Sequence, residues 1–364
     1  MDRPHPWPLP PVRAGGAARD RGVAIGRALR SSVGAHLDAW RRSLPGGDPD
    51  DYVAKLLDET DFNPAIHRHA PDIWDELAGV AEGAGQPLDQ LYALQLLDEE
   101  WAYRARRGAA SPPKCSSLAS VNADGTSWLA QNMDLGDYTD SFQVMLRIDD
   151  ADHPSALVFS TAGMLGLMGV NAAGVGVCVN SLPQLPSAPQ GLPVAFVLRR
   201  LLQALSLEEA ADLVQQLPHA TNQHYLIAEP GAARSFEASA AGVVEYHPPT
   251  PGCILHTNHP LAATPVLPEA PIARENSEAR LRSLVGRLSA GPAGEEAIGS
   301  ALCANDDPRH PVCREIPPPG SGPATITTGS MISLLGSRGV RSWVSAGPPS
   351  ERGYHAFRLA GAPR

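Results

Sequence analysis

The hydrophobic period of this chain changes at residue 115, and this change constrains the fold more than any other feature. Residues 24–42, 72–83 and 88–101 carry apolar side chains at helical spacing, and residues 104–114 break that pattern. After the break the apolar residues alternate with a period of two, which is typical of strands. We therefore expect a helical N-terminal part, a loose linker and a strand-rich remainder.

The strand-rich part also contains helices. Residues 193–205 and 206–217 predict two central helices, the second with a Ser206 to Glu209 capping box, and residues 277–288 predict a third. The chain order is helices first, followed by strands that surround two central helices. This order predicts an α+β fold. We expect a four-layer αββα sandwich of two antiparallel sheets with an N-terminal helical segment.

Composition excludes several classes of protein. The chain has 364 residues and a formal net charge of −10, so no basic field favours nucleic acid. It has neither an apolar run of membrane-spanning length nor the apolar core of a signal peptide at its start, which predicts a cytoplasmic protein that binds no membrane. The five cysteines are odd in number and scattered, which favours free thiols.

Cys115 stands where the basic, Pro- and Gly-containing linker meets the first strand. Its thiol is placed to attack the carbonyl of Lys114, and water would then release a new amino terminus on Cys115. An α-amine titrates near ~7.7–8.0 and can accept a proton at neutral pH, so one residue would hold both nucleophile and base. The alternative is a small buried residue at a strand start.

Two further residues suit this chemistry. Asp134 lies 19 positions after Cys115, and a hairpin turn at residues 122–126 would return it to the cysteine. Asn258 follows the apolar strand at residues 253–257, where its amide could donate to a tetrahedral oxyanion. The alternatives are an aspartate that caps a loop and a turn asparagine.

A second cluster suggests a metal-dependent hydrolase instead. Thiol, imidazole and carboxylate groups gather within eleven residues, at Cys303, Asp306, Asp307, His310 and Cys313. Their spacing matches no zinc pattern, and the prolines between them favour an ordinary loop. We therefore expect no metal.

Several motifs in order resemble a known family. They lie at residues 76–85, 115–117, 131–134, 169–177, 256–259 and 347–349. Together they resemble the isopenicillin N and acyl-coenzyme A:6-aminopenicillanate acyltransferases, within the N-terminal-nucleophile (Ntn) hydrolases. The resemblance implies cleavage between Lys114 and Cys115 into a helical fragment, 1–114, and a catalytic fragment, 115–364. This chain carries Lys114 where the fungal members carry Gly.

The resemblance also implies roles for residues and ligands. Cys115, Asp134 and Asn258 would be catalytic, and further pocket candidates are Asn132, Asn171, Asn222, His259, Thr328 and Ser330. The expected ligand is a small amide or thioester; no cofactor is expected, although acyl-coenzyme A is a candidate co-substrate. A second hypothesis keeps the fold but leaves the chain uncut as a binding protein, because the nitrogen of Cys115 would then be an amide and no base.

Overall fold

The computed structural model describes residues 11–108, 114–264, 267, 271–288, 293–318 and 320–360. Most of the predicted linker, residues 109–113, therefore lies outside the described residues. Within the described part, no helix combines the length and the apolar character needed to cross a bilayer.

Helices dominate the first hundred residues and recur later in the chain. In order they are α1 (Ala18–Ala28), α2 (Arg30–Ser43), α3 (Pro49–Asp58), α4 (Asn63–His69), α5 (Pro71–Ala84), α6 (Leu88–Gln95), α7 (Leu97–Ala105), the 3-10 helix η1 (Asp137–Thr139), α8 (Val194–Leu201), α9 (Leu207–Gln216), α10 (Pro271–Leu288), α11 (Glu295–Leu302) and α12 (Pro349–Arg352).

The strands form two sheets. The larger has the order β1 (Val12–Gly15), β4 (Gln143–Asp149), β5 (Ala156–Thr161), β6 (Met168–Asn171), β7 (Gly176–Ser181), β8 (Gln223–Glu229), β9 (Ala232–Ser239) and β10 (Gly242–Glu245). The smaller has the order β11 (Cys253–His256), β2 (Ser116–Val121), β3 (Ser127–Gly136), β12 (Thr325–Gly336), β13 (Gly339–Ser345) and β14 (His355–Ala360). Neighbouring strands are antiparallel except β1, which pairs parallel with β4 at the sheet edge.

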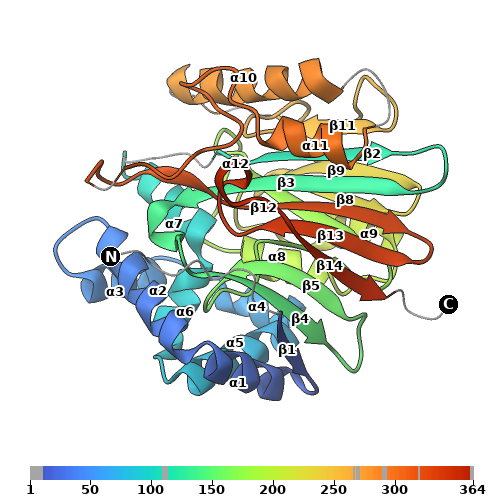
Figure 1. Cartoon of the computed structure of the whole chain (residues 1–364). Coiled ribbons are helices and arrows are strands. Elements are labelled where there is room, and N and C mark those ends of the chain that lie inside the picture. The colour runs from blue at the N-terminus through green and yellow to red at the C-terminus, as the bar shows by residue number, and fades with distance from the viewer. Residues whose placement is uncertain are drawn as a thin grey trace.

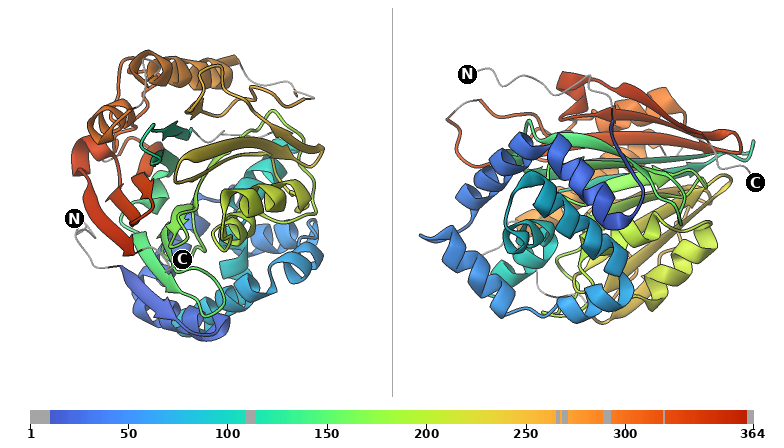
Figure 2. Two further views of the ribbon diagram at one scale, coloured as in Figure 1. Left: turned by 90° about the vertical axis from the view of Figure 1, so that its right-hand side faces the viewer. Right: turned by 90° about the horizontal axis from the view of Figure 1, so that it is seen from below.

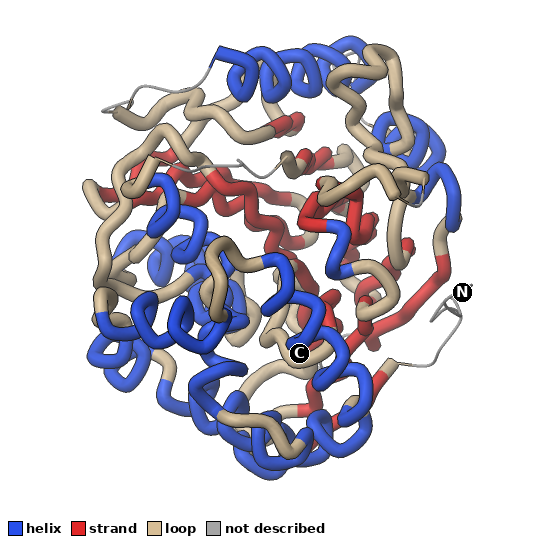
Figure 3. The backbone as a smooth tube through the Cα atoms, turned by 90° about the vertical axis from the view of Figure 1, so that its left-hand side faces the viewer, coloured by secondary structure: helices blue, strands red, loops and turns tan. Residues whose placement is uncertain are grey.

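The two sheets stack face to face between layers of helices (Figure 1). Helices α10 and α11 pack on the outer face of the smaller sheet, and α8 and α9 pack on the larger one. The N-terminal helices gather beside α8 and the β1 edge, so strands lie between helices on both sides (Figures 2 and 3). The predicted αββα sandwich is confirmed.

Among the described residues, the two larger apolar clusters follow from this layering. One joins the facing sheets to the N-terminal helices, and the other fills the space between the smaller sheet and α10–α11. Helices α1 and α5 approach closely because glycines meet at their contact. A Cβ on Gly22 would lie 2.0 Å from the Glu76 carbonyl oxygen, so only glycine fits there.

Two predicted helices are each broken into two. The helix expected at residues 24–42 is α1 followed by α2, with a break at Leu29, and the one expected at 88–101 breaks at Leu96. Ser206 caps α9 as predicted, because its hydroxyl accepts from the Glu209 N–H at 3.2 Å. The second bond of the capping box is displaced by one residue, since the Glu209 carboxylate accepts from the Leu205 N–H at 2.8 Å.

Candidate active site

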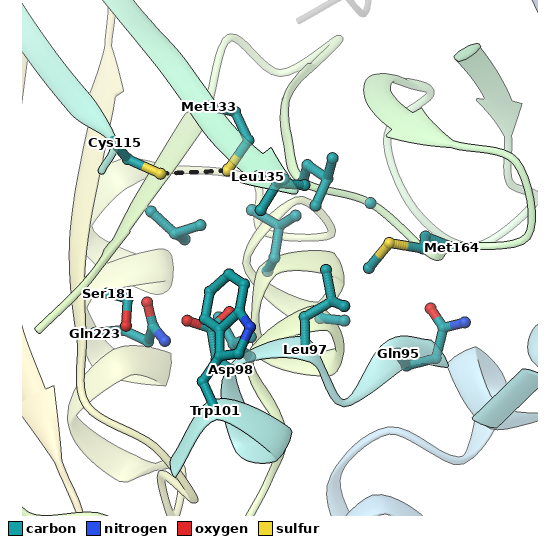
Figure 4. Close-up of a pocket in the computed structure, with 16 residues that line it drawn as sticks. Gln95, Leu97, Asp98, Trp101, Cys115, Met133, Leu135, Met164, Ser181 and Gln223 are labelled. Atoms are coloured by element: carbon teal, nitrogen blue, oxygen red, sulfur yellow. Dashed lines mark hydrogen bonds between the residues drawn. The ribbon is translucent and has the colours of Figure 1, made fainter. Parts of the chain in front are cut away.

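Cys115 immediately precedes β2 and is only 2% exposed. Its sulfur lies 3.5 Å from Met133 Sδ on the neighbouring strand, and the side chain lines a cavity between the sheets, α7 and α8 (Figure 4). Burial, reinforced by the Asp134 carboxylate, raises the pKa of the thiol to about 12, although a hydrogen bond from the Asp134 backbone N–H opposes the rise. In the uncut chain the sulfur is therefore protonated at neutral pH.

Asp134 is returned to Cys115 by the predicted hairpin. Ser116 pairs with Asn132, and the turn spans residues 122–126. The Asp134 carboxylate is fully buried, accepts from Thr327 Oγ1 at 2.7 Å and lies 3.5 Å from Arg314 Nε. Burial raises its pKa to about 6, against the opposing charge of Arg314.

A bulge in β12 lies directly after Thr327, whose hydroxyl binds Asp134. The register between β12 and β3 shifts between Thr327 and Gly329, so one residue of β12 is left without a partner on β3. Thr327 remains opposite Asp134, and its oxygen also accepts from the Arg314 backbone N–H at 2.9 Å. Gly329 is required beside the bulge, since a Cβ there would lie 2.1 Å from the Phe159 ring.

Asn258 follows β11, and Arg280 of α10 connects it to Cys115 and to the start of β2. Arg280 donates to the carbonyl oxygen of Cys115, to Ser116 Oγ at 2.9 Å and to Asn258 Oδ1 at 2.8 Å. The Asn258 amide also donates to the Ser181 carbonyl oxygen at 2.9 Å. This bond occupies one of the two N–H groups of the amide. Burial lowers the pKa of Arg280 to about 10, so the guanidinium stays charged at neutral pH.

The residue before the candidate scissile bond is half-buried. Lys114 lies within the field of Arg314, Asp134 and Arg280. Burial and the two arginines lower its pKa, whereas Asp134 raises it. The chain therefore enters β2 through this cluster of charged side chains.

Three predicted pocket amides serve the fold elsewhere. Asn132 donates to the carbonyl oxygens of Leu302 and Val312, at 2.8 and 3.0 Å, on the α11 side of the smaller sheet. Asn171 donates to two backbone carbonyls just after α8, and Asn222 to a carbonyl in the loop after β7. None of the three lines the cavity beside Cys115, because each amide is committed to holding a backbone turn or helix end.

The other three candidates also point to structural partners. His259 Nδ1 lies 2.8 Å from Ser277 Oγ of α10, and burial lowers the imidazole pKa to about 4. The Thr328 hydroxyl meets a threonine hydroxyl of η1 at 2.7 Å, and Ser330 Oγ lies 2.8 Å from the Tyr354 hydroxyl. The structure does not bring these side chains to the cavity.

The rival cluster at residues 303–313 does not converge on one point. Asp306 pairs with Arg287, and His310 Nδ1 lies 3.0 Å from the Asn276 amide. Cys313 Sγ lies 3.3 Å from a serine hydroxyl of α12. Across the described residues, no group of three or more His, Cys, Asp or Glu side chains is arranged to hold a metal ion.

Sequence reasoning missed Arg280 and Arg314. Arg280 is one of several arginines on a helix of alternating charge, and spacing alone does not reveal that it is fully buried. Its partners flank neighbouring strands of the smaller sheet: Cys115 immediately precedes β2 and Asn258 follows β11, so only the assembled fold shows the connection.

Comparisons with known proteins find similarity in sequence and in structure. The chain is 29% identical over 193 residues to the 40 kDa form of acyl-coenzyme A:6-aminopenicillanic-acid-acyltransferase from Emericella nidulans, covering 52% of each chain. It thus spans about half the length of this curated relative. Similar solved structures include a conjugated bile acid hydrolase from Clostridium perfringens, with 12% identity, a TM-score of 0.42 and coverage of 67% of this chain and 92% of that one. Penicillin V acylase from Agrobacterium tumefaciens is 14% identical, with a TM-score of 0.42 and coverage of 68% of this chain and 86% of that one.

A family model gives the broader assignment. The model of the acyl-coenzyme A:6-aminopenicillanic acid acyl-transferases matches residues 121–313, more than half of the chain. The matched segment begins at the end of β2 and contains Asp134, Asn258 and Arg280. The chain therefore belongs to the acyl-coenzyme A:6-aminopenicillanic acid acyltransferase family.

Proposed function

We propose that the chain is an autoproteolytic cysteine amide hydrolase or acyltransferase that acts on small N-acyl compounds through a thioester. One observation carries the proposal. The Cys115 sulfur lines a cavity while its backbone carbonyl is held by Arg280, which also holds Asn258. A nucleophile in a cavity, connected to a preorganised amide, is the arrangement that acyl transfer requires.

The first step is cleavage of the Lys114–Cys115 bond. The Cys115 sulfur attacks the Lys114 carbonyl carbon, a C–S bond replaces the C–N bond, and the thiol proton passes to the released nitrogen. Water then hydrolyses the thioester, leaving a carboxylate on Lys114 and a free thiol and amine on Cys115. Fragments 1–114 and 115–364 remain packed together.

The second reaction uses the new terminus. The α-amine takes the thiol proton, which overcomes the high pKa that burial gives the thiol in the uncut chain. The thiolate attacks the substrate carbonyl, with Asn258 and the Asp134 backbone N–H as candidate donors to the oxyanion. Asp134 orients the protonated amine. The acyl group then passes from sulfur to water or to an amine.

Transfer to an amine agrees with the name of the relative from Emericella nidulans, which is an acyl-coenzyme A-dependent acyltransferase. Acyl-coenzyme A is thus a candidate acyl donor for this chain, and it would be a co-substrate that leaves after each turnover. A small amine would be the acceptor. The proposal assigns no step to a metal or to a resident cofactor.

Intact mass and N-terminal sequencing test the first step. We expect two fragments that meet at Cys115 in the purified protein and a single chain in Cys115→Ala. Cys178→Ala is the matched control, because Cys178 is also buried, on β7, and that variant should cleave normally. An active protein whose only free start is the original amino terminus would contradict the proposal and favour the uncut chain.

A further inference from the structure

A buried carboxylate holds the chain on both sides of Asn258. Glu237, on β9 of the larger sheet, is fully buried, and one of its oxygens lies 2.8 Å from His256 Nε2 at the end of β11. The same carboxylate accepts from the backbone N–H groups of residues 261–263, at 2.6, 3.0 and 2.6 Å. The segment that carries Asn258 is therefore closed into a loop by one side chain. The mechanism proposed above uses neither Glu237 nor His256.

The pairing of β11 with β2 places this loop next to the nucleophile. The ladder between the two strands ends where His256 lies opposite Ser117. Because the strands are antiparallel, Asn258 and Cys115 each stand two residues beyond that last pair, on the same side of it. A movement of His256 relative to β2 therefore changes the distance between the candidate oxyanion donor and the sulfur.

The peptide group between Thr257 and Asn258 is held at both of its polar ends. His256 Nδ1 donates to the Thr257 carbonyl oxygen at 2.9 Å, and the Asn258 N–H donates to Ser277 Oγ of α10 at 2.8 Å. Since a peptide group is planar, these two bonds fix its orientation, and with it the direction in which the Asn258 side chain leaves the backbone. His256 thus acts on the backbone of Asn258 and not on its amide.

The His256 ring carries a positive charge, because both of its nitrogens face acceptors. The Thr257 carbonyl oxygen can only accept, and so can the Glu237 carboxylate in its ionised form. Burial acts to raise the pKa of Glu237, but hydrogen bonds from His256 and from the backbone, together with the charge of His256, lower it below its usual value. Glu237 and His256 therefore form a buried ion pair.

A second imidazole fixes the plane of the first. The His224 ring of β8 stacks on His256, with the ring centroids 3.7 Å apart and 10° between the planes. Burial, reinforced by the charge of His256, lowers the pKa of His224 well below its usual value, so a neutral ring faces the cation. His224 Nδ1 lies 3.0 Å from Asn180 Oδ1, and its Nε2 lies 2.8 Å from Ser235 Oγ. The stack joins the two sheets two residues before Asn258.

We propose that Glu237 and His256 are positioning residues for the oxyanion donor. Glu237 fixes the charge and the place of His256, and His256 sets the backbone from which the Asn258 amide reaches the substrate carbonyl. Neither side chain lines the cavity beside Cys115, so their loss should slow the chemical step and leave substrate binding almost unchanged. The inference rests on the proposed function, because it takes Asn258 to be the donor.

Nitrogen-15 NMR of histidine-labelled protein tests the ion pair without turnover. At pH 8, wild type should show a ring with both nitrogens protonated, and His256→Gln should remove that signal. Glu237→Gln should convert it to the signal of a neutral ring, because an amide does not stabilise the cation. Glu245→Gln is the matched control, since Glu245 forms an ion pair with Arg234 in the same sheet, and it should keep the signal. A wild-type spectrum without a doubly protonated ring overturns the inference.

A double-mutant cycle tests the positioning role on 4-nitroanilides of straight-chain acyl groups, from acetyl to hexanoyl. Glu237→Gln should lower kcat about 100-fold and change KM less than about threefold, as expected for a donor misplaced by about an ångström. Asn258→Ala should lower kcat at least about 100-fold. Adding Glu237→Gln to Asn258→Ala should then cost less than about a further threefold, because the donor that Glu237 positions is already absent.

Two further variants complete the kinetic test. His256→Gln keeps a neutral donor for Glu237 and loses the donor to the Thr257 carbonyl, so it should show the same loss of kcat as Glu237→Gln. Glu245→Gln should retain the wild-type kcat and KM. If Glu237→Gln fails to fold, the wild-type spectrum still decides the ion pair and His256→Gln decides the positioning role.

The outcomes separate this inference from the proposed function. Losses that multiply to about 10⁴-fold in the double variant overturn the positioning role, since they show that Glu237 does not act through Asn258. Normal turnover in both Glu237→Gln and His256→Gln overturns it as well. Turnover that Asn258→Ala leaves unchanged, or that is absent with every anilide, would overturn the proposed function and the positioning role with it, even where the spectrum shows the ion pair.

Discussion

The Arg280 guanidinium donates to Asn258 Oδ1 at 2.8 Å while another of its nitrogens binds the carbonyl oxygen of Cys115. One fully buried side chain thus sets the distance between the candidate nucleophile and the candidate oxyanion donor.

Arg280→Lys should slow both self-cleavage and amide hydrolysis by about 100-fold, because lysine keeps the charge but cannot reach both partners and so misplaces the site by about an ångström. Rates of fragment formation and of anilide release check this. Arg282→Lys is the control, since Arg282 lies on the same helix with 68% of its side chain exposed. Equal rates in both variants would rule out a positioning role for Arg280.

Asp134 should impose an acid limit on activity. Its pKa in the uncut chain is raised to about 6, so the carboxylate is lost as the pH falls through 6, and kcat/KM should fall more steeply below that point than protonation of the Cys115 α-amine alone causes. Asp134→Asn should lower the activity at pH 8 and remove the limb near pH 6. Asp124→Asn, in the exposed 122–126 turn, should retain the wild-type profile. A profile that is flat between pH 5 and 7 in wild type would contradict the role of Asp134.

The reactivity of Cys115 should depend on cleavage. Burial raises the thiol pKa of all five cysteines, to about 12 for Cys115 and about 11 for Cys313, so the uncut chain should react slowly with iodoacetamide. In the cleaved protein the α-amine provides a base, and Cys115 should label at least about tenfold faster. Peptide mass analysis of cut and uncut species from one maturing sample measures both, with Cys253 as the internal reference. Identical labelling of Cys115 in the two species would exclude activation by cleavage.

A buried ion triad should hold the two predicted fragments together. Glu76 of α5 binds Arg21 of α1 at 2.9 Å and Arg199 of α8 at 2.7 Å, with all three side chains 5% exposed or less. Glu76→Gln should cost about 3–5 kcal/mol of unfolding free energy, because it leaves buried charge uncompensated. Glu82→Gln should cost less than about 1 kcal/mol, since the Arg19–Glu82 pair is exposed. Denaturant unfolding distinguishes them, and equal losses would show that burial of the triad is unimportant.

The sequence predicts local hairpins well and long-range contacts poorly. Asp134 returns to Cys115 because a short turn joins β2 to β3. Gly125 in that turn has a positive φ, and the Asp-Gly pair predicts such a turn. The helix breaks at Leu29 and Leu96 have no such signal, because the apolar spacing runs through them and packing decides where the helix stops.

The same limit applies to the site. Cys115, Asp134 and Asn258 stand at strand ends where a motif marks them. Arg280 is recognised only when its partners are known, and these lie 165 and 22 residues away in the chain. The asparagines at 132 and 171 share the residue type of an oxyanion donor, but their amides bind backbone carbonyls that no local pattern reveals.

Helix α7 ends before residue 114, and the sulfur that it faces comes after that residue. In the proposed cleaved form the pocket is an interface between two polypeptides translated as one, and docking alone maintains its shape. Fragments 1–114 from relatives with other residues on α7 could then be exchanged by co-refolding, giving hybrids that share one reaction centre but prefer different substrates.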